Sequence, residues 1–350
     1  MTRPHNSQNI TIRCLTKTHY GLGHFRRCLT LANDFKKKKY TIHFIIDPNV
    51  FVEKELISNK ISFTNISNFK NNSFAKKEIM NIMKLKNSKI LIIDLREFSE
   101  NLLKSFQNES IKTILLDDAW TKTACADLIF NGTMVSKYHR YSTLKNKAKL
   151  FLGVKYFIID SSFIKFQKKI SQIKNKKKYS ITISFGGTDP NNVTFKVLRS
   201  IISLPNISIK IIVGPYFKKL NLIQKFIKNY KHIRIIQSPQ KIWKEFYSSD
   251  LVISSAGNTL FELATQNVPT LIIAADEHQI PYGKNISKAG FGLFMGLWKS
   301  LTPLKITKTL QSILLDTNQR KNISKNGKKL IDGKATSRII FEIEYFLKKV

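Results

Sequence analysis

Short apolar runs alternate with stretches of helical spacing along this chain, and the alternation restarts in the second half. The first series of apolar runs covers residues 10–15, 41–46, 90–94 and 113–116. The second series covers residues 181–185, 207–213, 233–236, 251–254 and 269–274. Strands that alternate with helices favour parallel βαβ packing, so we predict an α/β chain with two similar domains.

A lysine-rich stretch at 164–178 interrupts the alternation. It predicts an N-terminal domain over 1–165, a linker over 166–178 and a C-terminal domain over 179–350. The length of 350 residues supports two domains of ordinary size. Two such domains are expected to leave a cleft between them, and the last helical run, 337–349, is predicted to pack back on the N-terminal domain.

The composition narrows the class of protein. Hydrophobic residues make up 42% of the chain, yet no apolar stretch approaches the roughly 20 residues of a membrane span, and the N-terminus lacks a signal-peptide core. We therefore expect a cytoplasmic protein. The formal charge of +36 comes mostly from lysine clusters such as 36–39 and 174–178. These clusters lack interleaved arginine and aromatic residues, which disfavours a nucleic-acid partner.

Three cysteines, Cys14, Cys28 and Cys125, cannot all pair with one another, and none lies in a Cys-x-x-Cys motif. We expect reduced thiols. Cys28 lies one helical turn beyond His24, so it is either half of a catalytic Cys-His pair or a buried small apolar residue. The second interpretation is favoured.

A glycine-rich turn, Gly21-Leu22-Gly23-His24, lies between the first apolar run and a helical pattern. In a parallel sheet such a turn lies at the edge where ligands bind, and a helix start there offers backbone N–H groups to an anion. The turn matches neither the dinucleotide fingerprint nor the Walker loop. From this segment alone, His24 is equally well a structural cap, a ligand or a base.

Two turns in the second half suggest phosphate binding. Gly186, Gly187 and Thr188 follow one predicted strand, and their alternative is an ordinary βα turn capped by Asp189. Small residues also precede a second predicted helix, whose start at Gly257, Asn258 and Thr259 offers N–H groups to a diphosphate.

Further polar residues follow other predicted strands. Glu262 either accepts hydrogen bonds from ribose hydroxyls or complements the helix dipole, and Gln279 belongs to a polar loop that is equally typical of a plain helix start. Asp94 and the pair Asp117-Asp118 orient a histidine, bind sugar hydroxyls or cap a helix. The chain has no Asp-x-Asp pair and no clustered His and Cys spacing, which favours chemistry without a metal or cofactor.

Taken together, these motifs resemble those of the UDP-sugar hydrolases of the pseudaminic acid pathway and the related spore-coat polysaccharide proteins. More distantly they resemble the peptidoglycan UDP-N-acetylglucosamine transferase. The matching residues, by their numbers in this chain, are Gly21, Gly23, His24, Arg27, Cys28 and Leu29; Leu116, Asp117, Asp118, Cys125 and Asp127; Gly153 and Tyr156; residues 184–189; Ser255, Ala256, Gly257 and Glu262; and Gln279, Gly290, Asp332, Gly333 and Arg338.

The resemblance implies a GT-B fold, in which two Rossmann-like domains face a cleft and the C-terminal domain binds most of UDP. It implies that His24 acts as general base on a water that expels UDP from the anomeric carbon with inversion. The substrate-binding candidates are Gly21, Gly23, Arg27, Asp94, Asp118, Gly186, Gly187, Thr188, Gly257, Asn258, Thr259, Glu262 and Gln279.

One position departs from the family pattern. The family usually has a tyrosine two residues after the aspartate that corresponds to Asp94, and this chain has Arg96. Either the sugar differs or the acceptor is not water. The alternatives are therefore an inverting UDP-sugar glycosyltransferase and a nucleotide-sugar-binding protein without activity. A lipid acceptor would call for peripheral contact between a basic face and an anionic membrane.

Overall fold

The computed structural model describes residues 8–18, 21–66, 72–96, 100–118, 126–139, 141 and 148–349. Among the sequence-derived candidates, Cys125 lies outside these residues. The chain divides into two compact units: the first comprises Met1–Ile158 with Lys334–Val350, and the second comprises Ile159–Gly333.

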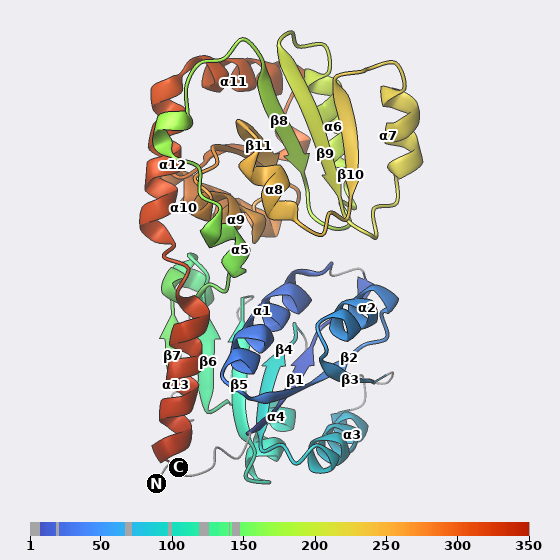
Figure 1. Cartoon of the computed structure of the whole chain (residues 1–350), viewed down its shortest axis with the longest axis vertical. Helices are drawn as coiled ribbons and strands as arrows, with labels where there is room; N and C mark the ends of the chain where they lie inside the picture. Colours follow the sequence, from blue (N-terminus) through green and yellow to red (C-terminus); the bar gives the residue numbers. More distant parts are fainter. Residues whose placement is uncertain are drawn as a thin grey trace. The chain divides into compact units, whose positions relative to one another are not determined.

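The first unit is a parallel sheet flanked by helices (Figure 1). Its strands are β1 (Asn9–Cys14), β2 (Thr41–Ile46), β3 (Ser62–Asn65), β4 (Ile90–Asp94), β5 (Lys112–Asp117), β6 (Leu128–Asn131) and β7 (Lys149–Leu152). Its helices are α1 (Gly23–Lys37), α2 (Val50–Ser58), α3 (Asn72–Leu85), α4 (Glu100–Gln107) and α13 (Ala335–Lys349).

The strand order of the first sheet, β3-β2-β1-β4-β5-β6-β7, has a topological switch point. After β1 the chain builds outward through β2 and β3, and it then returns to place β4 on the other side of β1. Every pair in the sheet is parallel. The loops that follow β1 and β4 diverge at such a point, which is where open α/β sheets bind ligands.

Apolar side chains cover both faces of this sheet, as expected for near-continuous apolar strands. One face packs against α1 and the C-terminal helix α13, whose residues Ile339, Ile340 and Ile343 are buried in the same cluster as Ile10 and Phe25. The opposite face packs against α3 and α4, through Ile79 and Leu103 among others. The last helix of the chain is therefore part of the core of the first unit, as Figure 1 also shows.

The second unit repeats this architecture. Its strands are β8 (Tyr179–Ser184), β9 (Ile207–Val213), β10 (Ile233–Gln237), β11 (Leu251–Ser254), β12 (Thr270–Ala274) and β13 (Leu293–Leu297). Its helices are α5 (Ser161–Lys165), α6 (Val193–Ile201), α7 (Leu220–Ile227), α8 (Ile242–Tyr247), α9 (Thr259–Thr265), α10 (Ile280–Lys288), α11 (Pro303–Leu315) and α12 (Thr317–Leu330).

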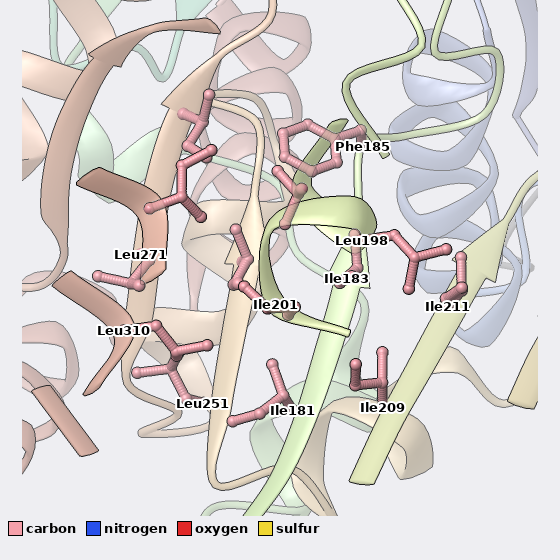
Figure 2. Packing of buried hydrophobic residues seen from close by; sticks show 14 of the residues in the cluster. Ile181, Ile183, Phe185, Leu198, Ile201, Ile209, Ile211, Leu251, Leu271 and Leu310 are labelled. Carbon is pink, nitrogen blue, oxygen red and sulfur yellow. The ribbon is translucent and has the colours of Figure 1, made fainter. Parts of the chain in front are cut away.

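The strands of the second sheet are all parallel, in the order β10-β9-β8-β11-β12-β13. Its switch point therefore lies between β8 and β11. In the core, Ile181 and Ile183 of β8 lie beside Ile209 and Ile211 of β9, and α6 covers them with Leu198 and Ile201 (Figure 2).

The prediction of an α/β architecture is confirmed, and each predicted strand exists with small shifts at its ends. The sequence analysis missed the short strands β3, β6, β7 and β13. Three of them, β3, β7 and β13, are edge strands, and most of their residues are partly exposed.

The unit boundaries differ from the expected ones. The chain leaves the first unit after Ile158, and the stretch expected to be a linker, 166–178, belongs to the second unit. The backbone N–H of Lys168 donates to the Gln266 carbonyl at 2.9 Å, and Asn267 Nδ2 donates to the Lys168 carbonyl at 2.8 Å. These bonds attach the lysine-rich stretch to the turn after α9. Among the described residues, no helix has the length and apolarity needed to cross a membrane.

Candidate active site

Three side chains of α1 converge on one carboxylate at the switch point of the first sheet. His24, Arg27 and Cys28 are spaced three and four residues apart, so they share one face of the helix. That face meets Asp94, the last residue of β4, and the backbone N–H of Leu15 after β1 donates to the Asp94 carbonyl at 2.9 Å. Asp94 is fully buried.

The carboxylate of Asp94 accepts several hydrogen bonds. His24 Nδ1 lies 2.6 Å from Oδ1, Arg27 Nη2 lies 2.5 Å from the same oxygen, and Arg27 Nε lies 2.5 Å from Oδ2. The Cys28 thiol donates to Oδ2 at 3.2 Å. Burial alone would raise the pKa of Asp94, but the positive charge of Arg27 and the contact with His24 hold it well below its usual range.

This arrangement determines the tautomer of His24. Because Asp94 is ionised, the proton in the 2.6 Å contact belongs to Nδ1 of the imidazole. The 3.2 Å separation between Arg27 Nη2 and His24 Nδ1 follows from their sharing Asp94 Oδ1 as acceptor. A neutral His24 thus carries its acceptor lone pair on Nε2, the atom that a general base needs.

Arg27 bridges two carboxylates. Its Nη1 donates to Asp118 Oδ2 at 2.7 Å, while Nε and Nη2 bind Asp94. Burial opposes the charge of Arg27, but Asp118 and Asp94 outweigh it and raise the pKa of the guanidinium. Burial likewise would raise the pKa of Asp118, and Arg27 lowers it. The pairing keeps all three groups ionised and fixes Asp94 against His24.

The Cys28 thiol is a structural group in this network. Burial, and next the hydrogen bond with Cys14, raise the pKa of Cys28 well above its usual value. A buried thiol that donates to a carboxylate is a poor nucleophile because catalysis needs the thiolate. The geometry supports the interpretation of Cys28 as a buried small residue.

Arg96 contacts the other nitrogen of the imidazole. It lies two residues beyond Asp94, its side chain is exposed, and its Nε donates to His24 Nε2 at 3.3 Å. The sequence singled out this position as a departure from the family pattern, but it gave no sign that the arginine contacts the histidine itself.

The glycines of this turn have a conformational role. Gly21 has a φ of +74°, which favours glycine, and Gly23 is the first residue of α1. A further network missed by the sequence analysis supports the turn: Thr16 Oγ1 donates to the Asp47 carbonyl at 2.8 Å, and the Thr16 N–H donates to Asp47 Oδ2 at 3.1 Å. These bonds join the loops after β1 and β2.

The second unit presents backbone groups at its own switch point. Gly186, with a φ of +84°, and Gly187 follow β8, and a Cβ on either would meet no atom within 4 Å. Thr188 is half-buried in the same turn. Asp189 is the helix cap anticipated from the sequence, since its carboxylate accepts from the Val193 N–H at 3.0 Å and the Thr194 N–H at 2.8 Å.

The turn after β11 leads through Gly257 and Asn258 into α9, which begins at Thr259. The N–H groups of Leu260 and Phe261 donate to the carbonyls of Gly257 and Asn258, at 3.1 and 3.0 Å, so the candidate donors at this helix start are the N–H groups of residues 257–259. Glu262 is half-buried in the first turn of α9.

Gln279 joins these loops. Its Oε1 accepts from the Ala256 N–H at 3.2 Å and from the Ala275 N–H at 3.0 Å. Asn191 Nδ2 donates to the Ala275 carbonyl at 2.7 Å, which adds the loop after β8. The side-chain oxygen of Gln279 therefore positions the loops, a role that its polar sequence context did not reveal.

The predicted residues thus fall into two groups. The first unit brings together His24, Arg27, Asp94 and Asp118, and the second brings the loops of Gly186–Thr188 and Gly257–Thr259 to one sheet edge through Gln279. Across the described ranges, no set of three or more His, Cys, Asp or Glu side chains is arranged to hold a metal ion.

Comparison with known proteins identifies relatives that align with most of the chain. An uncharacterized protein of Methanocaldococcus jannaschii is 31% identical over 281 residues, which are 77% of this chain and 57% of that protein. The spore coat polysaccharide biosynthesis protein SpsG of Bacillus subtilis is 23% identical and aligns over 91% of this chain and 93% of its own length. The UDP-2,4-diacetamido-2,4,6-trideoxy-β-L-altropyranose hydrolase of Campylobacter jejuni is 26% identical over 79% of this chain and 92% of its own.

Solved structures show the same fold. MurG of Acinetobacter baumannii superposes with a TM-score of 0.69 at 14% identity, covering 97% of this chain and 99% of its own. MnaA of S. aureus, solved with UDP, superposes with a TM-score of 0.68 at 14% identity over 98% of each chain. The predicted GT-B fold and the predicted resemblance are confirmed. The model of the glycosyltransferase family 28 C-terminal domain matches residues 161–338, half of the chain, and the chain belongs to that family.

Proposed function

We propose that this protein hydrolyses a UDP-linked amino or deoxy sugar at the anomeric carbon, without a metal ion, releasing UDP and a free sugar of inverted configuration. The proposal assigns it to the synthesis of nonulosonic acids or surface polysaccharides. Support comes from the names of two relatives, the Campylobacter jejuni hydrolase and SpsG. The UDP bound in the MnaA structure supports the choice of nucleotide.

The observation that carries the proposal is the His24–Asp94 pair. Asp94 is buried and ionised, and it holds the Nδ1 proton of His24, which leaves Nε2 as a base of fixed orientation. In the proposed reaction Nε2 takes a proton from water while the water oxygen bonds to the anomeric carbon. The bond from that carbon to the diphosphate oxygen breaks, and UDP leaves. Asp94 then stabilises the imidazolium, as the carboxylate of a catalytic triad does.

The second unit supplies the nucleotide-binding groups in this proposal. The N–H groups at Gly257–Thr259 and the open turn at Gly186–Thr188 are donors for the diphosphate, on which negative charge grows as the bond breaks. Glu262 is assigned to the ribose hydroxyls. Removal of one such donor would raise the barrier by about 3 kcal/mol, by analogy with oxyanion holes.

Proton NMR of the purified protein with a panel of UDP-sugars and no acceptor tests the proposal. We expect free sugar with an inverted anomeric configuration, formed at the same rate in the presence of EDTA. His24→Gln should slow the reaction about a hundred- to ten-thousand-fold while UDP affinity is retained. His232→Gln is the matched control. His232 belongs to the second unit, where its half-buried ring lies edge-on to Tyr230 and its Nε2 contacts the Ile202 carbonyl.

One observation favours a second candidate, transfer to an acceptor other than water. Arg96, where the resembled family has a tyrosine, donates to His24 Nε2, so the residue beside the proposed base departs from the pattern of the hydrolases. In that case the sugar would be consumed only when an acceptor hydroxyl is added. Binding of UDP-sugars with no turnover under either condition would contradict both reactions and indicate a nucleotide-sugar-binding protein.

A further inference from the structure

Arg96 covers His24 Nε2, the atom that accepts the proton in the proposed reaction. Its Nε–H donates to His24 Nε2 at 3.3 Å, and Nε2 has a single lone pair. A guanidinium stays protonated in proteins, so Arg96 cannot itself accept a proton from water or from a sugar hydroxyl. For His24 to act as a base, the hydrogen bond from Arg96 has to be exchanged for one from the reacting hydroxyl.

The charges around His24 indicate what promotes this exchange. Arg27 pairs with Asp94 and Asp118, and the Arg96 guanidinium lies against the imidazole. When His24 takes a proton, a second positive charge develops beside Arg96. An anionic group brought by the substrate would offset this charge, and carboxylates pair with guanidinium groups through two parallel hydrogen bonds.

The diphosphate of UDP does not fit this role. In an inverting reaction the leaving group departs from the side of the anomeric carbon opposite to the attacking oxygen. The base lies beside the attacking oxygen, and Arg96 lies beside the base. The anionic group that reaches Arg96 is therefore carried on the sugar or on the acceptor.

We propose that Arg96 is a specificity-determining residue that covers His24 Nε2 until a carboxylate of the substrate, on the sugar or on the acceptor, pairs with its guanidinium. This inference rests on the proposed function, because it assigns His24 as the base. A carboxylate on the sugar fits hydrolysis, and a carboxylate on the acceptor fits the transfer reaction named as the second candidate. It narrows the substrate class to acidic sugars or acidic acceptors. Since the Arg96 side chain is exposed, its replacement should leave the fold intact.

Imidazole ¹⁵N NMR tests the inference without requiring turnover. His24 is assigned by the loss of its signals in His24→Gln, and the Nε2 resonance is followed with UDP-glucuronate and with UDP-glucose, which differ in the sugar carboxylate. A further arm adds free glucuronate to the protein loaded with UDP, so that the carboxylate comes from the acceptor side. We expect Nε2 to shift with at least one carboxylate source and not with UDP-glucose, and we expect Arg96→Gln to abolish the difference.

Kinetics provide the second readout. With the carboxylate source that shifts Nε2, kcat/KM should exceed that of the neutral compound by about 10- to 100-fold, the range of a hydrogen bond to a charged group. Arg96→Gln should remove this preference by lowering turnover of the acidic compound, and Arg96→Lys should restore part of it. An equal loss with acidic and neutral compounds in Arg96→Gln would mean that Arg96 only positions the imidazole, and it would overturn the inference.

The outcomes separate the two proposals. A carboxylate-dependent shift of Nε2 with no consumption of any UDP-sugar would contradict the proposed function and leave the role of Arg96 standing. Consumption of UDP-sugars without any carboxylate-dependent shift of Nε2 or preference in kcat/KM would support the proposed function and overturn the role of Arg96. An unchanged response in Arg96→Gln would also overturn the role of Arg96.

Discussion

The two units have the same topology but present different chemistry at their switch points. The first unit places charged and titratable side chains at the edge that follows β1 and β4, among which Asp94 is fully buried and His24 is 5% exposed. The second unit leaves the corresponding space between β8 and β11 to glycines, helix-start N–H groups and one amide oxygen. The fold alone therefore does not determine the chemistry of a sheet edge.

The difference follows from what each task requires. A base has to be held by a fixed partner, and a buried carboxylate provides this only if cations balance its charge, as Arg27 does for Asp94. A diphosphate needs donors that approach closely, which small residues and helix starts provide without charged side chains. Substitutions in the first unit should therefore change turnover, and substitutions in the second should change nucleotide affinity.

The largest expected effect is that of Asp94→Asn. It replaces the carboxylate that fixes the His24 tautomer by a neutral amide and leaves Asp118 as the charged partner of Arg27 in the network described above. Turnover of the UDP-sugar should fall about 10⁴-fold, and the free energy of unfolding should fall by about 3–5 kcal/mol. Urea unfolding and steady-state kinetics measure the two effects, and calorimetry should find UDP affinity unchanged.

Glu55→Gln is the control for Asp94→Asn in the same unit. Its carboxylate pairs with Arg26 on the surface, where such pairs contribute about 0–1 kcal/mol. If Asp94→Asn proves as mild as Glu55→Gln, the buried network does not hold the base.

Gly214→Ala should have the largest effect in the second unit. A Cβ at Gly214 would lie 2.4 Å from the Cα of Gly187, so the backbone of the glycine turn has to move. We expect a loss of about 1–3 kcal/mol in the free energy of unfolding, together with weaker UDP binding in calorimetry. Gly257→Ala is the comparison, since its Cβ would meet only Ser255 Oγ, at 3.9 Å. Unchanged UDP affinity in both variants would argue against a nucleotide site at this edge.

Gln279→Ala should have a smaller effect of the same kind. It removes the acceptor for the N–H groups of Ala256 and Ala275 and so loosens two loops. The free energy of unfolding should fall by about 1–2 kcal/mol, and KM should rise more than kcat falls. Gln237→Ala, at the exposed end of β10, is the control and should change neither the free energy of unfolding nor the kinetic constants. A fall in kcat with an unchanged KM would place Gln279 in the chemical step.

The smallest effect concerns pH. Burial raises the pKa of Asp118, but the charge of Arg27 lowers it by a larger amount. The pKa in the folded state therefore lies below the ordinary 3.8. The stabilisation from this carboxylate is therefore complete above pH 3.8 and is lost as the pH falls below that value. Because the Asp118 side chain is 24% exposed, we expect about 1 kcal/mol.

Urea unfolding of the wild type and of Asp118→Asn at a series of pH values measures this contribution. The difference between the two proteins should shrink as the pH falls below 3.8. A constant difference down to pH 2 would show that the Arg27–Asp118 pair does not stabilise the fold.

The sequence predicted those features that depend on local pattern. Apolar runs located the central strands, helical spacing placed Cys28 one turn beyond His24, and the family resemblance singled out Arg27. It left open whether Asp94, 70 residues from His24, orients the histidine, binds sugar hydroxyls or caps a helix, because the contact with the imidazole depends on β4 lying next to β1. Sheet order is a tertiary property that short-range spacing does not encode.

The roles of single polar residues were harder to predict for the same reason. Gln279 contacts two loops only because β11 and β12 are neighbours, and Arg96 reaches His24 only because both follow adjacent strands. The assignment of 166–178 to a linker was based on lysine content, which does not reveal that the backbone of Lys168 pairs with the turn at Gln266.

The most direct test of the central claim compares UDP affinity with turnover in His24→Gln. Calorimetry with UDP and a kinetic assay of UDP release from a UDP-sugar that the wild type consumes are run on the same preparations. The account predicts a Kd for UDP within about twofold of the wild type and a turnover lower by about two to four orders of magnitude. Loss of UDP binding in a folded variant, or turnover close to that of the wild type, would contradict it.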